Sequence, residues 1–311
     1  SILLEPSRTN LATYSQDFSQ WSTISASATD NYATSPEGIT NASRFLTTST
    51  GAYLYLSSIS VSNSTEYTIS VYAKSNGNSL DDFRIYTSIG DSSTLTATSQ
   101  WQRFTYTFTT STTSINIGFR PSGTQNADIQ IYGYQIEEGS YSTSLIHTSG
   151  STVTRSADAP SGAGNSDLIN ASEGVLYFET IAFDDISALR MITIESADNN
   201  NRVSIGYSNT SNAVRVTIRV NGSNVVNQNL TASNLTNSNK FAFKYKTGAS
   251  SIFLNGSEVL DLSSTSFTFS QSLTLLNLDG GAGTNKFYGK VKVLAVFKEV
   301  LTDAELTTLT S

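Results

Sequence analysis

The sequence predicts an all-β protein made of two antiparallel β-sandwich (jelly-roll) domains in tandem, followed by a short C-terminal helix. Three observations lead to this prediction. Charged residues make up only 14% of the 311 residues, against about 25% in ordinary globular proteins, and Ser, Thr, Asn and Gly, which disfavour helices, fill the difference. Apolar residues recur at every second position in short runs. The chain also exceeds the usual size of one hydrophobic core, so two domains are expected.

The first half of the chain consists of short alternating runs, each bounded by Gly, Asn, Ser or Asp. A period of two over such short runs is typical of strands in an antiparallel sandwich. We predict strands at 49–60, 66–74, 82–88, 100–109, 114–120 and 128–137.

The second half repeats this pattern and then changes at its end. We predict strands at 174–183, 190–195, 201–207, 213–220, 240–245, 251–254, 274–278 and 286–297. Asn221-Gly222 and Asn255-Gly256 predict tight turns, because both residue types tolerate a positive φ. Thr302 followed by Glu305 has the spacing of a capping box, so a short helix is expected over 302–309.

A Gly- and Ser-rich stretch near the middle separates the two halves. Pro160 is followed by Ser-Gly-Ala-Gly-Asn-Ser, which has no apolar side to bury. We therefore predict a first sandwich over 1–158, a linker over 159–170 and a second sandwich over 171–311.

The composition excludes several functions. The net charge of −7 and the lack of a basic cluster argue against a nucleic-acid partner. Without cysteine there are no disulfides, no thiolate metal ligands and no thiol nucleophile. No apolar run approaches the roughly 20 residues that span a bilayer, so membrane insertion is not expected.

Five strings occur together in a recognisable order. They are LLEPSRTNL (3–11), QDFSQW (16–21), QIEEGSYSTSLIHTSGSTVTRSAD (135–158), SEGVLYFE (172–179) and the closing FYGKVKVLAVFKEVLTDAELTTL. Together they resemble bacteriophage tail and other virion structural proteins. In that group a sandwich similar to carbohydrate-binding modules precedes a concanavalin A-like lectin/glucanase domain, and the closing string is similar to the end of laminin-G-like and pentraxin-like domains.

The resemblance implies a non-catalytic glycan- or receptor-binding component of a phage virion, in the tail or a fibre, that attaches to host-surface polysaccharide. The implied location is the virion or the extracellular space. The implied partners are a polysaccharide or cell-surface glycan and other virion proteins, and a homo-oligomer stays open. Two alternatives stay open as well: a purely structural virion protein, such as a capsid decoration or tail part, and the ancillary binding region of a polysaccharide-degrading enzyme.

Catalytic patterns are missing from the sequence. His147 is the single histidine, and no G-x-S-x-G string marks a nucleophilic serine. Glycosidases need two carboxylates facing one cleft, but the E-x-D-x-x-E string that supplies them in concanavalin A-like enzymes does not occur. We therefore do not expect an enzyme.

Three pairs of residues combine aromatic or polar side chains on one side of a predicted strand with aliphatic ones on the other. They are Tyr53 with Tyr55, Arg84 with Tyr86, and Tyr132 with Tyr134. Aromatic rings can stack on sugar C–H groups while a guanidinium binds hydroxyls, so we predict that these six residues form a carbohydrate-binding face. The alternative is a tyrosine layer that covers the core. Trp21 and Trp101 are interpreted as framework residues.

No cofactor is certain from the sequence, and calcium is the ion that would suit a cysteine-free, oxygen-rich sandwich. The resemblance implies an Asp on the last strand of the first sandwich as a calcium ligand, but Tyr132-Gly133 stands there. In the second sandwich, the acidic loop between Asp279 and Asn285 is the candidate metal site. The alternative is a Gly-rich hairpin turn.

Overall fold

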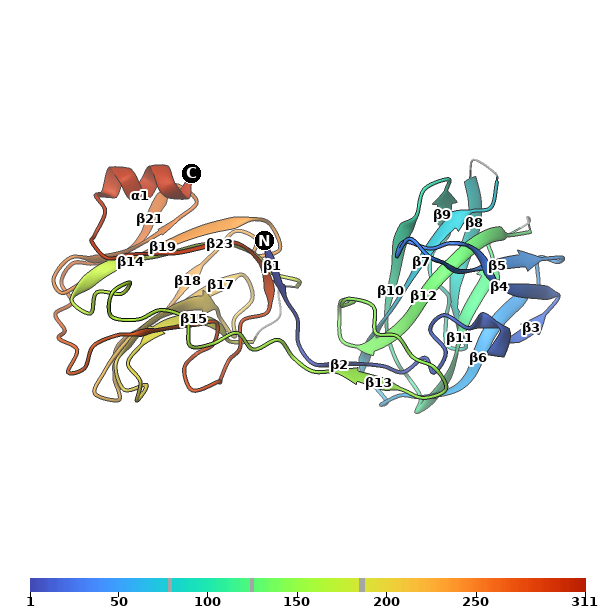
Figure 1. The fold of residues 1–311 in the computed structure, drawn as a ribbon, viewed down its shortest axis with the longest axis horizontal. Helices are drawn as coiled ribbons and strands as arrows, with labels where there is room; N and C mark the ends of the chain where they lie inside the picture. The colour runs from blue at the N-terminus through green and yellow to red at the C-terminus, as the bar shows by residue number, and fades with distance from the viewer. Residues whose placement is uncertain (78–79, 124–125, 185–187) are drawn as a thin grey trace. The chain divides into compact units, whose positions relative to one another are not determined.

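A computed structural model describes residues 1–77, 80–123, 126–184 and 188–311, and it confirms the predicted all-β class. The chain forms two compact units. One unit, Ser7–Ser156, is called the inserted sandwich. The other joins Ser1–Pro6 to Ala157–Ser311 and is called the outer sandwich (Figure 1).

Two five-stranded antiparallel sheets form the inserted sandwich. The first has the order β10 (Gln102–Thr109), β7 (Glu66–Ser75), β12 (Asp128–Glu138), β5 (Thr40–Thr47) and β4 (Ala26–Thr34). The second has the order β3 (Ser22–Ile24), β6 (Tyr53–Ser60), β11 (Ser114–Pro121), β8 (Leu80–Thr87) and β9 (Leu95–Thr98). The short ribbon of β2 (Arg8–Asn10) and β13 (Val153–Arg155) and the 3-10 turn η1 (Phe18–Gln20) complete the unit.

The alternation of side chains explains how these strands pack. On β7, Ile69, Val71 and Ala73 are fully buried in the core between the sheets, while Tyr72 and Lys74 point to the other side and are only half-buried. On β8 of the other sheet, Phe83 and Ile85 are buried in the same core, while Arg84 and Tyr86 are half-buried. Each sheet therefore has an inner side that builds the core and an outer side that is free to carry other chemistry.

The outer sandwich has a six-stranded and a five-stranded sheet. The six strands are β1 (Ile2–Leu4), β23 (Gly289–Phe297), β14 (Glu173–Ile181), β19 (Asn239–Lys246), β20 (Ser250–Leu254) and β21 (Ser257–Leu262). The five are β18 (Ser223–Thr231), β17 (Ala213–Val220), β16 (Arg202–Tyr207), β15 (Arg190–Glu195) and β22 (Leu275–Asn277). Both predicted Asn-Gly turns join hairpins, β17–β18 and β20–β21, and all four turn residues have positive φ.

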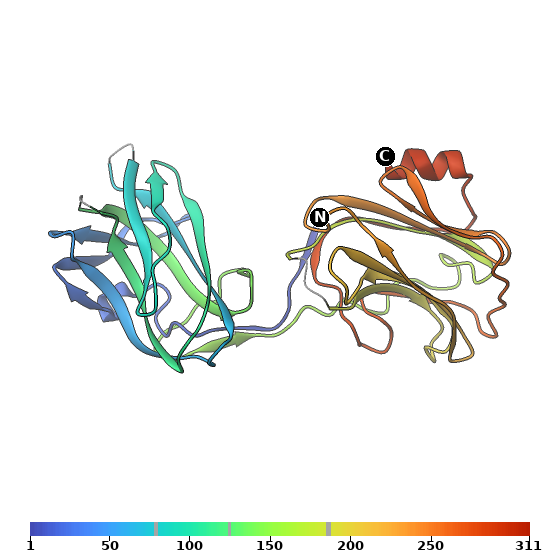
Figure 2. The same cartoon turned by 180° about the vertical axis from the view of Figure 1, so that it is seen from behind.

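The predicted C-terminal helix is present as α1 (Asp303–Thr310), and its capping box forms as the sequence indicates. The buried Leu306 packs with Tyr177 and Phe253 in a second small core outside the six-stranded sheet. Figures 1 and 2 show α1 lying along that sheet, close to β19 and β21. The outer side of this sheet therefore has an apolar patch where α1 covers it. Among the described residues, no helix has the length and apolar character needed to cross a bilayer.

The first strand of the chain belongs to the outer sandwich, which differs from the predicted first domain of 1–158. β1 pairs with β23, with Ile2 opposite Val291 and Leu4 opposite Gly289 (Figure 1). Leu4 is 3% exposed and lies in the core of the outer sandwich. The first sandwich is therefore an insertion in the second, and the chain passes between them at Pro6–Ser7 and at Ser156–Ala157.

The stretch predicted as a linker, 159–170, lies within the outer sandwich. Ala163 forms a β-bridge with Leu276, with backbone hydrogen bonds of 3.2 and 2.6 Å. Ile169 is 3% exposed and joins the core. Asp158, which directly precedes this stretch, forms two hydrogen bonds with Glu5, the residue that follows β1. The Gly-rich composition therefore marks irregular backbone rather than a free connection.

The insertion predicts that a change in β1 destabilises the outer sandwich alone. Leu4→Ala should lower the free energy of unfolding of that unit by about 2 kcal/mol, because it removes a buried side chain. Scanning calorimetry of the whole chain should then show one of two unfolding transitions moving to lower temperature. Ile2→Ala is the matched control, since Ile2 is 62% exposed on the same strand. Movement of both transitions, or of neither, would contradict the assignment of β1.

Candidate functional site

Four of the six residues predicted to contact sugar come together in the second sheet of the inserted sandwich. Tyr53 and Tyr55 lie on β6, and Arg84 and Tyr86 lie on β8; β11 runs between these two strands. The residues between them belong to the core, so all four project outward. The rings of Tyr53 and Tyr86 meet edge to face with centroids 4.8 Å apart. Burial and the neighbouring Tyr53 raise the pKa of Tyr86, which keeps its hydroxyl neutral.

Arg120 of β11 lies in the middle of this group. It stands directly opposite Arg84, its Cζ is 5.1 Å from the Tyr53 ring centroid, and its Nη1 is 2.9 Å from Asp91 Oδ2. The Arg84 side chain has no hydrogen bond or ion pair with any described residue, and its Nε is buried. The positively charged side chains of Arg84 and Arg120 therefore stand opposite each other, and Arg84 has no carboxylate partner among the described residues. We call the three tyrosines and two arginines the tyrosine–arginine face.

The remaining two predicted residues, Tyr132 and Tyr134, lie in the other sheet and do not share a side, contrary to the prediction. The register of β12 against β7 shifts between Tyr132 and Gln135. Gly133, at the shift, has a φ of 66°, which glycine adopts without steric cost. This β-bulge adds one residue to β12, so the side chains after it alternate in the opposite sense.

The bulge at Gly133 determines on which side of the sheet Tyr132 and Tyr134 lie. Tyr134 is fully buried in the core, with its ring centroid 4.9 Å from Trp21 and 5.2 Å from Phe119. Tyr132 lies on the outer side, but it is only 1% exposed and its hydroxyl accepts a hydrogen bond from Gln16. Neither ring is accessible to a sugar as the structure stands.

The outer side of the first sheet carries an aromatic group that the sequence interpretation missed. Trp101 is half-buried rather than part of the core, and Lys74 Nζ lies 5.2 Å from its ring centroid. Arg103 lies over Tyr72, with Cζ 5.4 Å from the ring centroid. We call these four residues the tryptophan face. The two-residue spacing of Trp101 and Arg103 could have indicated that they share one side of the strand. The other side of that strand is equally aromatic, so the sequence did not show which side faces the core.

The polar groups of the tryptophan face are already bonded to the protein. Arg103 Nη2 donates to Ser70 Oγ at 2.8 Å and to the Thr143 carbonyl at 2.6 Å. The Trp101 indole N–H donates to the Thr34 carbonyl at 3.1 Å. The face therefore has little hydrogen-bonding capacity left for a ligand.

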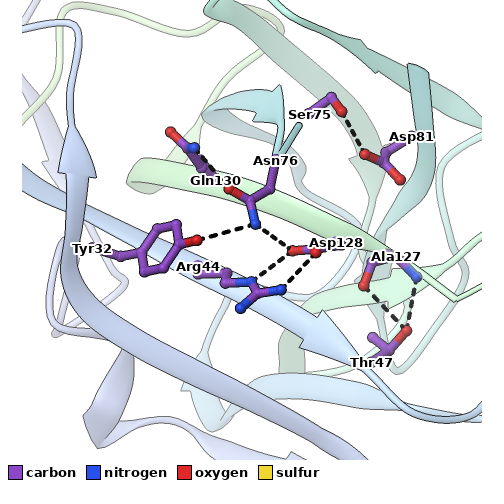
Figure 3. Close-up of polar contacts among 9 residues, drawn as sticks. All are labelled: Tyr32, Arg44, Thr47, Ser75, Asn76, Asp81, Ala127, Asp128 and Gln130. Atoms are coloured by element: carbon purple, nitrogen blue, oxygen red, sulfur yellow. Dashed lines mark hydrogen bonds and ion pairs between the residues drawn. The ribbon is translucent and has the colours of Figure 1, made fainter. Parts of the chain in front are cut away.

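A network of polar side chains (Figure 3) lies next to this face, since Gln130 of β12 stands opposite Lys74 of β7. Arg44 donates to both oxygens of Asp128, from Nε at 2.8 Å and from Nη2 at 2.7 Å. Asn76 links Asp128 to Tyr32, and it accepts a hydrogen bond from Gln130. Burial acts to raise the pKa of Asp128, but the hydrogen bonds from Arg44 and Asn76 outweigh it and hold that pKa below its usual value.

The loop predicted as a metal site, from Asp279 to Asn285, is held in place by hydrogen bonds within the chain. Asp279 Oδ1 accepts the Gly281 N–H at 2.6 Å, and Arg202 Nη1 donates to the Gly280 carbonyl at 2.6 Å. The Asn285 carbonyl accepts the Met191 N–H. No group of three or more His, Asp or Glu side chains converges in the part of the chain that the structure describes. Arg202 thus contacts the backbone of the loop that was predicted as the metal site.

His147 has a partner that the sequence did not indicate. Its Nε2 lies 3.0 Å from Glu37 Oε1, and its Nδ1 lies 2.7 Å from Gln16 Nε2, with half of the His147 side chain exposed. Both ring nitrogens of His147 therefore contact groups other than a hydroxyl. Activation of a serine nucleophile would require one of these nitrogens to contact the serine hydroxyl.

Comparisons with known proteins find likenesses only among solved structures, since no family model and no curated protein matches the chain. A heptameric SAP-like pentraxin from Limulus polyphemus is 14% identical, over 49% of this chain and 74% of its own, with a TM-score of 0.37. The CBM22-1 xylan-binding domain from Paenibacillus barcinonensis is 13% identical, over 44% and 97%, with a TM-score of 0.33.

Mouse laminin alpha1 domains LG4-5 are 10% identical, over 80% of this chain and 86% of their own, with a TM-score of 0.31. Scores this low do not identify a family. The all-β class rests on the strands described above.

The different environments of Tyr134 and Tyr86 predict losses of stability of different size. Tyr134→Ala should lower the free energy of unfolding of the inserted sandwich by about 3–5 kcal/mol, because it empties a large buried site. Tyr86→Ala should cost only about 1 kcal/mol, the size of one aromatic pair. Urea unfolding of the full-length variants measures both. Equal losses would show that the tyrosine–arginine face is part of the core.

The Arg44–Asp128 pair predicts a loss of stability in acid. Because the pKa of Asp128 is lowered in the folded protein, its contribution is complete above the ordinary value near 4 and disappears as the pH falls through the folded value. The pair is about a quarter exposed, so Asp128→Asn should cost about 1 kcal/mol at pH 7.

The same variant should flatten the fall in melting temperature below about pH 4. Glu66→Gln is the control, since this exposed carboxylate has no partner among the described residues. The interpretation fails if both variants show the acid profile of the unmodified protein.

Proposed function

We propose that the inserted sandwich is a non-catalytic carbohydrate-binding unit, and that the glycan lies on the tyrosine–arginine face. The observation that carries the proposal is the guanidinium of Arg84, which has no partner among the described residues and lies beside three half-exposed phenol rings. Aromatic surface next to unsatisfied planar donors is the combination that sugars need, because their rings are apolar on the C–H side and polar at the rim.

The individual groups suggest how a sugar would be held. The T-shaped contact of Tyr53 and Tyr86 fixes both rings and limits the side-chain entropy that binding would cost. Arg120 is oriented by Asp91, so its guanidinium remains a fixed cation in the floor of the face. Arg84, in contrast, can turn its fork to a pair of hydroxyls or to a uronate carboxylate.

The tryptophan face is the weaker candidate on the same sandwich. It has the larger aromatic ring, but Arg103 and the Trp101 indole N–H already bond to the protein. A sugar there would gain stacking without new hydrogen bonds. A face that offers both is expected to bind more tightly and more selectively.

In biological terms, we propose that this binding serves attachment of a phage virion, through its tail or a fibre, to host-surface polysaccharide. Support for this role comes from the five sequence strings that resemble virion proteins. A purely structural virion part and the ancillary binding region of a polysaccharide-degrading enzyme remain the competing roles. Binding to a glycan separates the first of these from our proposal, and depolymerisation of a bound polysaccharide would support the second.

A glycan array that includes neutral and uronate-bearing oligosaccharides should give at least one ligand for the full chain. For that ligand, Arg84→Gln and Tyr86→Ala should each weaken binding about tenfold or more, as truncations at a binding hot spot do. Calorimetric titration measures the affinities, and circular dichroism verifies the fold of each variant.

Trp101→Ala is the matched control, because it removes a half-exposed aromatic residue from the other sheet. Its affinity should stay within about twofold of the unmodified chain. Loss of binding in Trp101→Ala, with binding kept in Arg84→Gln, would move the site to the tryptophan face. The absence of any ligand at millimolar concentration would refute the binding function itself.

A further inference from the structure

A second polar site lies in the outer sandwich, on the outer side of its five-stranded sheet. The structure has a hollow of about 160 Å³ there. Strands β16, β17 and β18 and the loop after β22 contribute most of its walls. We call it the arginine hollow, and the residues that line it include Arg202, Ser204, Arg215, Thr217 and Asn227.

Short side chains on the middle strands create the hollow. Ser204 and Thr217 stand opposite each other on β16 and β17, and both are buried, at 2% and 6% exposure. Two residues away on the same side, Arg202 of β16 and Arg215 of β17 are much longer. Hydroxyl groups thus form the floor and guanidinium groups rise at its two ends.

The loop from Asp279 to Asn285 forms part of the wall. The Asp279 carbonyl accepts a hydrogen bond of 2.6 Å from Thr193 Oγ1 on β15, and Arg202 donates to the Gly280 carbonyl at 2.6 Å. These bonds fix the loop to the sheet. The segment predicted to hold calcium therefore has a definite place beside the hollow.

The charge of the hollow is positive. Arg202 and Arg215 are the charged residues among those that line it. Arg202 is partly balanced by the buried Glu195, which pairs with it across β15 and β16. Arg215 is held only by amide oxygens, with Nε 2.5 Å from Asn229 Oδ1, Nη1 2.7 Å from Asn227 Oδ1 and Nη2 3.3 Å from Asn209 Oδ1, which uses three of its five N–H groups. Its charge has no carboxylate partner in the described part of the chain.

Neutral oxygens orient a guanidinium without neutralising it. The Arg215 fork is thus held in one direction while its charge remains available to an anion, in a molecule whose net charge is −7. The volume is below the roughly 300 Å³ at which drug-sized pockets begin. A single sugar unit fits in this volume, and the rest of a polysaccharide chain would have to lie outside the hollow.

We propose that the arginine hollow binds one negatively charged sugar unit, with Arg215 on its carboxylate or sulfate and with the Asn227 amide and the Thr217 hydroxyl on its hydroxyl groups. This site is separate from the tyrosine–arginine face and does not depend on the function proposed for it. It gives the outer sandwich a ligand of its own. Acidic units in a surface polysaccharide are the chemistry that it recognises.

The test uses the full chain carrying Arg84→Gln, so that the tyrosine–arginine face contributes least. D-glucuronate, D-glucose and sodium sulfate are titrated separately, and binding is followed by the NMR shifts of the Arg215 Nε–H and Asn227 side-chain amide signals. We expect saturable shifts with glucuronate at millimolar concentration. Glucose, of the same size without the charge, should give none.

Adding Arg215→Gln should weaken glucuronate binding at least tenfold, as followed by the Asn227 signals. Lys290→Gln, which removes one positive charge from an exposed position of the six-stranded sheet, should leave it unchanged. Asn227→Ala should weaken glucuronate more than sulfate, which lacks the hydroxyl groups of a sugar; the Arg215 Nε–H signal reports on this variant.

Three outcomes would overturn the proposal. Equal binding of glucose would show that the charge plays no part, and unchanged glucuronate binding in Arg215→Gln would remove the assigned residue. Sulfate binding as tightly as glucuronate would reduce the site to one for simple anions. A failure of the tyrosine–arginine face to bind any glycan would leave these measurements unaffected, so the two proposals can fail separately.

Discussion

The fold and its candidate sites depend on one constraint: a β-strand sends successive side chains to opposite sides of its sheet. Each sandwich buries one side of each sheet in a common core, and this burial fixes the register of the strands. The other side of each sheet is then left for other uses. In the outer sandwich one such side is covered by α1, with Leu306 at its centre. The outer sides that lack such a cover carry the arginines and tyrosines that give the molecule its chemistry.

Local pattern was sufficient to predict much of this arrangement. The alternating runs predicted the all-β class, and the capping box at Thr302 and Glu305 predicted α1. Alternation also brought Tyr53, Tyr55, Arg84 and Tyr86 to one side of one sheet, although the sequence did not say that β11 would lie between their strands. These successes share a cause. Each depends on residues that are close in the sequence and on the periodicity of their own strand.

The failures arise where distant parts of the chain decide the structure. Tyr132 and Tyr134 have the spacing of a common side, but the bulge at Gly133 is visible only when β12 is paired with β7. The pairing of β1 with β23 joins the two ends of the described chain, and no local pattern in Ile2–Leu4 indicates it. The hydrogen bond from Arg202 to the Gly280 carbonyl was likewise not indicated by the sequence of the Asp279 loop, because Arg202 comes from a strand distant in sequence.

The insertion has a consequence for the order in which the protein folds. β1 has to wait for its partner β23, almost the whole chain later, and closing so long a loop carries an entropic cost that grows with its length. The inserted sandwich can form earlier, because all of its strands lie within Ser7–Ser156. Once folded, it holds its own two ends side by side, with Arg8 opposite Arg155 in the β2–β13 ribbon. Because the ends of the folded inserted sandwich lie side by side, its residues no longer add to the effective length of the loop between β1 and β23. On a ribosome, the first domain to be completed would thus prepare the assembly of the second.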